Sequence, residues 1–198
     1  MTVLDQHLDA LLNGRFLSGN YRPPSSPQNS PIFRLARSDD RDALYDLSDG
    51  SLTPFQFRQH VAQLLRWQAQ KRCCWLVVED NDRRRKTEDG RSYPRSSVLG
   101  PPSLIGSGQL VCYPHVAELA NLSVAPSRRG QGWGTKMIGL LTAVAHHWHI
   151  PYLEIVVDEE NPRALALYQR AGFAEERRLF LPDGRTALIL GKEITNYE

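Results

Sequence analysis

The chain alternates between two hydrophobic patterns, one with the period of a strand and one with the period of a helix. Apolar runs of strand length occupy 32–35, 73–78, 104–113, 118–124, 152–157, 173–181 and 187–191. Helical spacing begins after Ser38 and again at Thr53 and Pro54, and it covers 135–148 and 162–171. Three strands follow one another in mid-chain, and helices separate the later strands. This order predicts an α/β (α+β) fold with a mixed sheet.

Capping residues place several helix ends. Ser38 is expected to cap the first helix, with two acidic residues in its first turn. Asn161 is expected to cap the last helix, Pro162 to take its first position, and Gly172 to end it in the left-handed conformation. The buried face of the long helix is predicted to comprise Trp133, Met137, Leu140, Leu141, Val144 and Trp148. A glycine-rich stretch therefore connects the strand 118–124 to the long helix.

This stretch, Arg128-Arg129-Gly130-Gln131-Gly132-Trp133-Gly134, has the features of a phosphate-binding loop. Glycines let backbone N–H groups turn toward an anion, and the following helix N-terminus adds positive potential. A triphosphate-binding loop would need Lys before the hydroxyl residue, but here Thr135 precedes Lys136. A dinucleotide fingerprint would need G-x-G-x-x-G, and the third glycine falls one place early. The loop therefore predicts a phosphate ligand of another class.

A second motif lies downstream, after the predicted strand 152–157. It reads N-x-x-A-x-x-x-Y-x-x-x-G-F and comprises Asn161, Ala164, Tyr168, Gly172 and Phe173. Together with the R-x-x-G-x-G pattern of the loop, it resembles the acetyl-CoA site of the GNAT superfamily of N-acetyltransferases. The resemblance covers about residues 117–175. It implies a mixed, mostly antiparallel sheet that is flanked by helices and splayed between its fourth and fifth strands.

The resemblance also implies how acetyl-CoA is held as the cosubstrate. Amides of the loop and the helix start would bind the pyrophosphate, an amide near Val124 would face the thioester carbonyl, and Asn161 would line the pantetheine arm. The expected cofactor-binding residues are Leu122, Val124, Arg128, Arg129, Gly130, Gln131, Gly132, Trp133, Gly134, Thr135, Asn161, Ala164 and Tyr168. No metal is expected, because the crowded His146 and His149 suit the negative end of a helix without one.

Two residues are candidates for the chemistry of acyl transfer. Tyr168 matches the family tyrosine that protonates the leaving thiolate, and a phenol keeps its proton at neutral pH. It could instead be an aromatic residue on a buried helix face. Glu118 could remove the proton of the amine, directly or through water, and Glu154 is a further candidate. Each of these glutamates could instead be an ordinary exposed acid.

Composition limits the class of protein. The chain has 198 residues, a formal net charge of +2 and 41% hydrophobic residues, which suits a globular protein with one main domain. We expect an extension at 1–30, with an amphipathic arm and a Pro/Ser-rich tether, and an acetyltransferase domain at 31–198. No apolar run approaches the length of a membrane span, and no signal peptide is expected. The three cysteines do not suggest a disulfide framework, so a cytoplasmic location is expected.

A long basic insertion separates two predicted strands. Residues 80–103 include Arg83-Arg84-Arg85-Lys86, and the connection is far longer than a hairpin loop. A solvated, partly disordered insertion is the first interpretation. A contact with RNA or with an acidic substrate is the second, since four successive cations attract phosphate. No aromatic residues are interleaved as a base-stacking platform, so we do not expect a nucleic-acid partner.

The sequence predicts an acetyl-CoA-dependent N-acetyltransferase in which a primary amine attacks the thioester directly. The amine could belong to a protein N-terminus, a lysine or a small molecule, and Asp46, Asp49 and Asp183 are candidates to attract it. Two alternatives remain open: a non-catalytic CoA-binding module, and a ribosome- or RNA-associated protein that uses 83–86. The oligomeric state is left open between monomer and homodimer.

Overall fold

The chain is described from a computed structural model that covers residues 31–48, 50–80, 84–86, 92–94 and 103–194. The extension expected at 1–30 lies outside these ranges, as does Asp49. None of the helices in the described ranges combines the length and the hydropathy that a membrane crossing requires.

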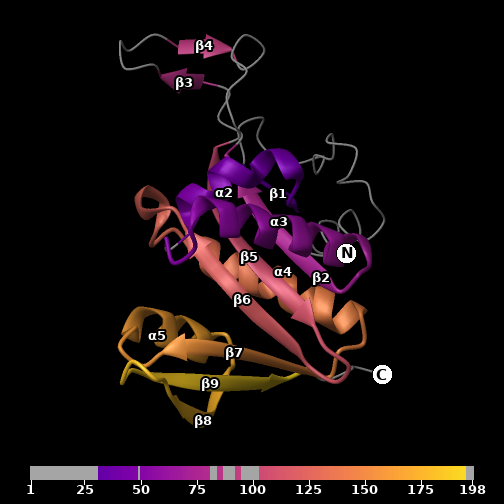
Figure 1. Ribbon diagram of the computed structural model, residues 1–198, viewed down its shortest axis with the longest axis vertical. Coiled ribbons are helices and arrows are strands. Elements are labelled where there is room, and N and C mark those ends of the chain that lie inside the picture. The colour runs from indigo at the N-terminus through magenta and orange to yellow at the C-terminus, as the bar shows by residue number, and fades with distance from the viewer. Residues whose placement is uncertain (1–30, 49, 81–83, 87–91, 95–102, 195–198) are drawn as a thin grey trace.

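Within the described residues, seven strands form one mixed sheet (Figure 1). In spatial order these are β1 (Ile32–Leu35), β2 (Cys73–Glu79), β5 (Leu104–Cys112), β6 (Ala117–Val124), β7 (Tyr152–Asp158), β9 (Thr186–Glu193) and β8 (Ala174–Phe180). Neighbouring strands are antiparallel except for β6 and β7, which are parallel. The mixed, mostly antiparallel sheet predicted from the sequence is confirmed.

Helices cover both faces of this sheet, as Figure 1 shows. They are α2 (Arg41–Leu47), α3 (Pro54–Ala69), α4 (Trp133–His147) and α5 (Pro162–Arg170). Successive residues of β2 point to opposite faces. Trp75 and Val77 join a core cluster with α2 and α3, whereas Leu76 and Val78 join the cluster with α4. The continuous apolar run of β2 is therefore explained by burial on both faces.

The sheet splays between β6 and β7. The two strands pair only through Ala117 with Leu153 and Glu118 with Glu154, so they diverge toward the carboxyl end of β6. This confirms the expected splay between the fourth and fifth strands of the main sheet. β6 also carries an irregularity in its pairing with β5, and there Asn121 has a φ of +50°.

The start of the first helical segment differs from the prediction. Ser38 does not cap a helix; it opens a short 3₁₀ turn, η1 (Ser38–Asp40), that leads into α2. The carboxylate of Asp40 instead accepts a hydrogen bond from the backbone N–H of Arg37 at 2.7 Å. Asp40 is buried together with the cation of an ion pair. The sequence pattern alone does not reveal which residue supplies that cation.

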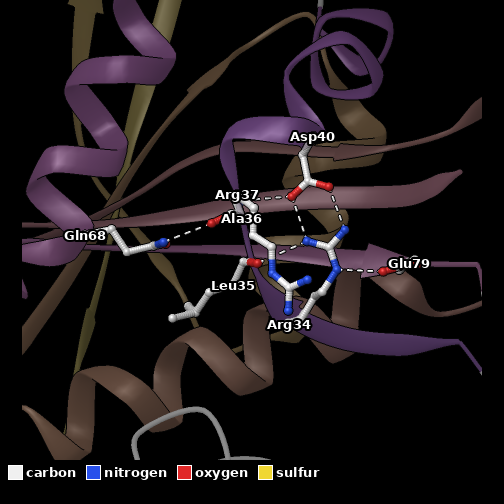
Figure 2. A network of polar contacts seen from close by, with 7 residues as sticks. All are labelled: Arg34, Leu35, Ala36, Arg37, Asp40, Gln68 and Glu79. Carbon is white, nitrogen blue, oxygen red and sulfur yellow. Dashed lines mark hydrogen bonds and ion pairs between the residues drawn. The ribbon is translucent and has the colours of Figure 1, made fainter. Parts of the chain in front are cut away.

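The partner is Arg34 on β1 (Figure 2). Its guanidinium binds both carboxylate oxygens of Asp40 at 2.6 Å, and its Nε donates to Glu79 at 2.6 Å. Burial alone would lower the pKa of Arg34, but the hydrogen bonds to the two carboxylates outweigh it and raise the pKa above its ordinary value. The network ties the entry of α2 to β1 and to the end of β2.

The other helix predictions are largely confirmed. Thr53 caps α3, Asn161 caps α5 with Pro162 at its first turn, and Gly172 follows α5 with a φ of +88°. The long helix α4 begins at Trp133, two residues earlier than 135. Its two tryptophans, Trp133 and Trp148, are only partly buried, and Ile138 and Ala145 complete the buried face.

The insertion at 80–103 contains a hairpin that the sequence pattern does not reveal. β3 (Arg84–Lys86) pairs antiparallel with β4 (Ser92–Pro94), and these strands do not join the main sheet. Most other residues of the insertion lie outside the described ranges. The interpretation of the basic run 83–86 therefore stays a prediction.

Candidate functional site

The glycine-rich segment forms the junction between β6 and α4. A 3₁₀ turn, η3 (Pro126–Arg128), leaves the strand, and Gly132 then caps α4 with a φ of +80° and no capping side chain. Lys136 N donates to Gly132 O, which is the first hydrogen bond of the helix. The preceding amides have no helical acceptor and lie at the positive end of the helix dipole. They are therefore available to an anion.

These amides border a cavity of about 480 Å³, which we call the loop cavity. Its walls come from the end of β6, the glycine-rich loop with the first turn of α4, and α5. It is lined by Leu122, Ser123, Val124, Arg128, Arg129, Gly130, Gly132, Trp133, Gly134, Thr135, Asn161, Arg163, Ala164, Leu167, Tyr168 and Arg170. The structure thus brings together every expected cofactor-binding residue except Gln131, which lies in the exposed loop beside the cavity.

Four arginines give the loop cavity a positive lining. Arg128 forms an ion pair with Asp80, at the start of the insertion, and the Nε of Arg129 donates to Val124 O at 3.1 Å. Arg163 and Arg170 lie seven residues apart on α5 and are exposed. Neither makes a hydrogen bond or an ion pair among the described residues. Their charge is therefore free to meet an anionic ligand.

Sequence reasoning missed four of the lining residues: Ser123, Arg163, Leu167 and Arg170. A signal was present for the two arginines. Arg163 stands inside the capping segment Asn-Pro-Arg-Ala, and a seven-residue spacing on a helix places Arg170 on the same face. Asn161 does cap α5, since its Oδ1 accepts from Ala164 N at 3.1 Å.

Tyr168 reaches the loop cavity from the buried side of α5. Its side chain is only 6% exposed and its ring packs edge-on against Phe173, with centroids 6.1 Å apart. Burial raises the pKa of Tyr168 to about 12. The phenol oxygen has no hydrogen-bond partner among the described residues, and it is not one of their fully buried unpaired atoms. A protonated, unpaired hydroxyl therefore opens onto the cavity.

The candidate base lies elsewhere. Glu118 sits at the closed end of the splay, opposite Glu154, and lines neither cavity described here. Its carboxylate lies 3.5 Å from the hydroxyl of Tyr113. Because Ala117 and Leu119 pack into the core on the α4 side, Glu118 faces the side of α2 and α3. The role of Glu118 stays a prediction.

A second cavity of about 270 Å³ lies beside the irregularity of β6, and we call it the bulge cavity. It is lined by Leu44, Leu47, Ser48, Ser51, Leu52, Phe57, His60, Trp75, Ser107, Gln109, Asn121, Leu122 and Ser123. Leu122 and Ser123 line both cavities, so the two meet at the end of β6. Asp46 and Asp183, expected to attract an amine, do not line it.

The remaining reactive groups do not form a separate site in the described part of the chain. Cys73 and Cys74 are buried and Cys112 is partly buried, and burial raises the pKa of each thiol above its usual value. Across the described ranges no three His, Cys, Asp or Glu residues are grouped as metal ligands. The two cavities are therefore the candidate site within the described residues.

A model of the acetyltransferase (GNAT) family matches residues 41–173, which is most of the described chain. The chain belongs to this family. Membership confirms the sequence-based prediction of an acetyltransferase that uses acetyl-CoA as cosubstrate. The match includes both motifs, from the glycine-rich loop to Phe173.

Individual relatives agree with the family. A mycothiol acetyltransferase of Jonesia denitrificans is 38% identical over 77 residues, which is 38% of this chain and 24% of that protein. The chain thus spans about a quarter of that relative. A GNAT-family acetyltransferase structure from Desulfovibrio desulfuricans matches 84% of this chain and all of its own, with 18% identity and a TM-score of 0.65. The NatC complex bound to Gag peptide and CoA matches 84% and 99%, with 19% identity and a TM-score of 0.64. Both structures show the shared fold.

Proposed function

We propose that this acetyltransferase transfers the acetyl group of acetyl-CoA to a primary amine by direct attack in a ternary complex. The observation that carries the proposal is the meeting of two cavities at Leu122 and Ser123, one of which is lined by Tyr168 with its unpaired hydroxyl. The loop cavity has the amides and cations that the anionic donor acetyl-CoA needs. The bulge cavity opens to the thioester end of that donor. The two buried thiols and the partly buried Cys112 have raised pKa values, which makes them poor nucleophiles for an acyl-enzyme and supports direct attack.

The loop cavity would hold the donor. The free amides at the start of α4 bind the pyrophosphate, and Arg129 adds charge beside them. Arg163 and Arg170 would neutralise the remaining phosphate of CoA, since both are cations without a partner in the described chain. Arg128 contributes less, because Asp80 already neutralises it. The backbone at the end of β6 is free of pairing with β7, so its groups are available to the pantetheine arm and the thioester.

The reaction needs one bond to form and one to break. The neutral amine attacks the thioester carbon, the N–C bond forms, and the C–S bond breaks with its electron pair on sulfur. Tyr168 donates a hydrogen bond to that sulfur and supplies the proton that yields free CoA thiol. The phenolate then regains a proton from solvent. An amide near Val124 would donate to the carbonyl oxygen as it gains negative charge.

The nitrogen must lose a proton in the same cycle. We assign this role to Glu118, because it lies on the same face of the sheet as the bulge cavity. Since Glu118 does not line that cavity, it would act through water. The assignment rests on the shared face alone. A Glu118→Gln enzyme with an unchanged kcat/KM and pH profile would remove it.

A direct test is acetyl transfer by the purified full-length chain. The chain is mixed with acetyl-CoA and a panel of amines, and the release of CoA thiol is followed together with the mass of the acceptor. Turnover that yields one acetylated amine per thiol supports the proposal. CoA binding without thiol release from any amine would favour a non-catalytic CoA-binding module. The cytoplasmic location and the oligomeric state stay predictions.

A further inference from the structure

We propose that the bulge cavity binds the α-amino group of an aminoacyl amide, with the amine uncharged, in preference to a lysine side chain or a polyamine. The proposal rests on the proposed function, because it names the acceptor of that same reaction. Its basis is the set of polar groups in the cavity, the absence of a carboxylate among the described lining residues, and the contact with the loop cavity.

A hydrogen bond between two residues of its wall keeps the bulge cavity next to the end of β6. The Oγ of Ser123 donates to the backbone carbonyl of Leu47 at 2.7 Å, which fixes the end of α2 against β6. Ser123 also lines the loop cavity. An amine at this end of the bulge cavity therefore lies next to the end of β6, where the thioester is expected.

A pair of carboxamides forms the polar wall. Asn121 Nδ2 donates to Gln109 Oε1 at 3.0 Å, and Gln109 is only 2% exposed. Gln109 Nε2 and Asn121 Oδ1 have no partner among the described residues. Asn121 is exposed and Gln109 Nε2 is not a fully buried unpaired atom, so both can be reached from the cavity.

The pair offers one hydrogen-bond donor and one hydrogen-bond acceptor side by side. An aminoacyl amide carries complementary groups, a C=O acceptor and the N–H donors of its amine and its amide. A polyamine carries donors only and would leave Gln109 Nε2 unpaired in a partly desolvated site, which is unfavourable. The carboxamide pair therefore favours an acceptor whose amine is followed by an amide.

The charge of the cavity favours the same acceptor. Among the described residues that line it, His60 is the only titratable one, and burial lowers the pKa of His60 below its usual value. A neutral, partly buried site disfavours a cation, so an amine must enter uncharged. Model α-amines have a pKa near 7.7–8.0 and lysine near 10.4, so at neutral pH the uncharged fraction is roughly 300-fold larger for an α-amine.

The apolar wall provides room for the first side chain. Leu44, Leu52 and Phe57 line the cavity opposite the carboxamides. The cavity holds about 270 Å³, enough for an aminoacyl group with a small or medium apolar side chain. The acceptor could be the end of a protein or a small aminoacyl conjugate, which share this chemistry.

The experiment compares kcat/KM for matched amines with the full chain and acetyl-CoA. The acceptors are an alanyl peptide without lysine, alanine amide, alanine methyl ester, an N-terminally blocked lysyl peptide and spermidine. We expect the free α-amines to exceed lysine and spermidine by at least about 100-fold. The ester keeps a low amine pKa but lacks the amide N–H, so we expect it to fall below alanine amide by roughly fivefold or more. A higher kcat/KM for the peptide than for alanine amide indicates that the acceptor is a protein terminus. Equal values of kcat/KM indicate a small aminoacyl conjugate.

Two variants sharpen the result. Asn121→Asp keeps a residue that tolerates a positive φ but places a carboxylate in the cavity, so the efficiency with spermidine relative to the alanyl peptide should rise at least about tenfold. Asp49→Asn tests whether a neighbouring acid holds the acceptor, because Asp49 lies between the cavity-lining Ser48 and Ser51 in the sequence; the order of acceptors should not change.

Spermidine or lysine turned over as well as the α-amines would overturn the inference and leave the proposed function intact. Loss of polyamine or lysine activity in Asp49→Asn would do the same, since the acceptor would then be held by a carboxylate. No turnover with any acceptor, despite measured CoA binding, would instead contradict the proposed function itself.

Discussion

Asn121 on β6 and Gln109 on β5 are joined across the irregularity of the sheet by a hydrogen bond of 3.0 Å. Asn121 has a φ of +50°, which asparagine tolerates better than most residues. Next to it, an added Cβ on Gly108 would lie 2.8 Å from Cδ1 of Leu122, so a larger residue there would push the Leu122 side chain aside. The irregularity of β6 and the wall that the two cavities share at Leu122 therefore involve neighbouring positions.

The first prediction concerns the cap of α4. Gly132→Ala should weaken CoA binding, because Gly132 has a φ of +80° and an alanine there costs about 1–2 kcal/mol or moves the free amides. Titration calorimetry with CoA measures the loss. Gly139→Ala is the matched control: Gly139 lies inside α4 with open space around an added Cβ, so this variant should bind CoA normally and gain up to about 1 kcal/mol in stability. Equal CoA affinities for the two variants would contradict the role given to the amides.

The second prediction concerns the acid. Tyr168→Phe keeps the ring packed against Phe173 but removes the hydroxyl, so kcat should fall by roughly 10²–10⁴-fold while CoA affinity stays within about twofold. Steady-state kinetics and calorimetry together check this. A kcat near that of the wild type in the folded variant would assign Tyr168 to packing alone.

The third prediction is the pH dependence of kcat/KM. Burial raises the pKa of Tyr168 to about 12, so the acid stays protonated through the neutral and alkaline range. The uncharged fraction of an α-amine rises with pH and saturates above its pKa of about 8. The profile should therefore rise to about pH 8 and stay level to about pH 10. A fall between pH 8 and 10 in an enzyme that remains folded would show that the essential acid has a lower pKa than that of Tyr168.

The fourth prediction concerns the free cations on α5. Arg163→Gln and Arg170→Gln should each weaken CoA binding roughly two- to fivefold, because exposed ion pairs contribute up to about 1 kcal/mol. The effect should shrink as salt rises and should be absent for dephospho-CoA if the 3′-phosphate is the partner. Arg177→Gln on β8 is a control that lines neither cavity. An equal loss for CoA and dephospho-CoA would place the arginines on another part of the donor.

The fifth prediction concerns the buried ion pair of Figure 2. Asp40→Asn should lower the free energy of unfolding by about 3–5 kcal/mol, because Asp40 is fully buried and Arg34 would lose its bidentate partner. Denaturant unfolding measures this. Asp42→Asn removes an exposed carboxylate from the adjoining first turn of α2 and should change stability by less than about 0.5 kcal/mol. Similar effects from the two variants would show that burial of the pair has little energetic weight.

The sequence revealed the fold and the donor side of the site because both depend on local patterns. Gly132 and Asn161 act through their own turn and helix cap, and those features are visible within a few residues of sequence. The amine side depends on contacts between distant segments. Gln109 meets Asn121, and Ser123 meets Leu47 over 76 positions, so no spacing rule reveals them. The acidic residues suggested for the amine were chosen by charge alone, and the described ones do not line the bulge cavity.

Buried charge was the other feature that sequence reasoning could not place. Asp40 looked like a first-turn acid of a helix capped by Ser38, but it is the buried partner of Arg34. An acid at this position can either stabilise a helix dipole or form an ion pair, and only the contact with Arg34 in the folded chain distinguishes the two roles.

Acetyl transfer from acetyl-CoA to an alanyl peptide, measured side by side for the wild type and Tyr168→Phe, tests the central claim most directly. We predict that the wild type releases one CoA thiol for each peptide that gains an acetyl group at its α-amine. The variant should bind CoA equally well but turn over at least about 100-fold more slowly. Wild-type protein that binds CoA yet releases no thiol with any amine, or a variant as fast as the wild type, would contradict the account.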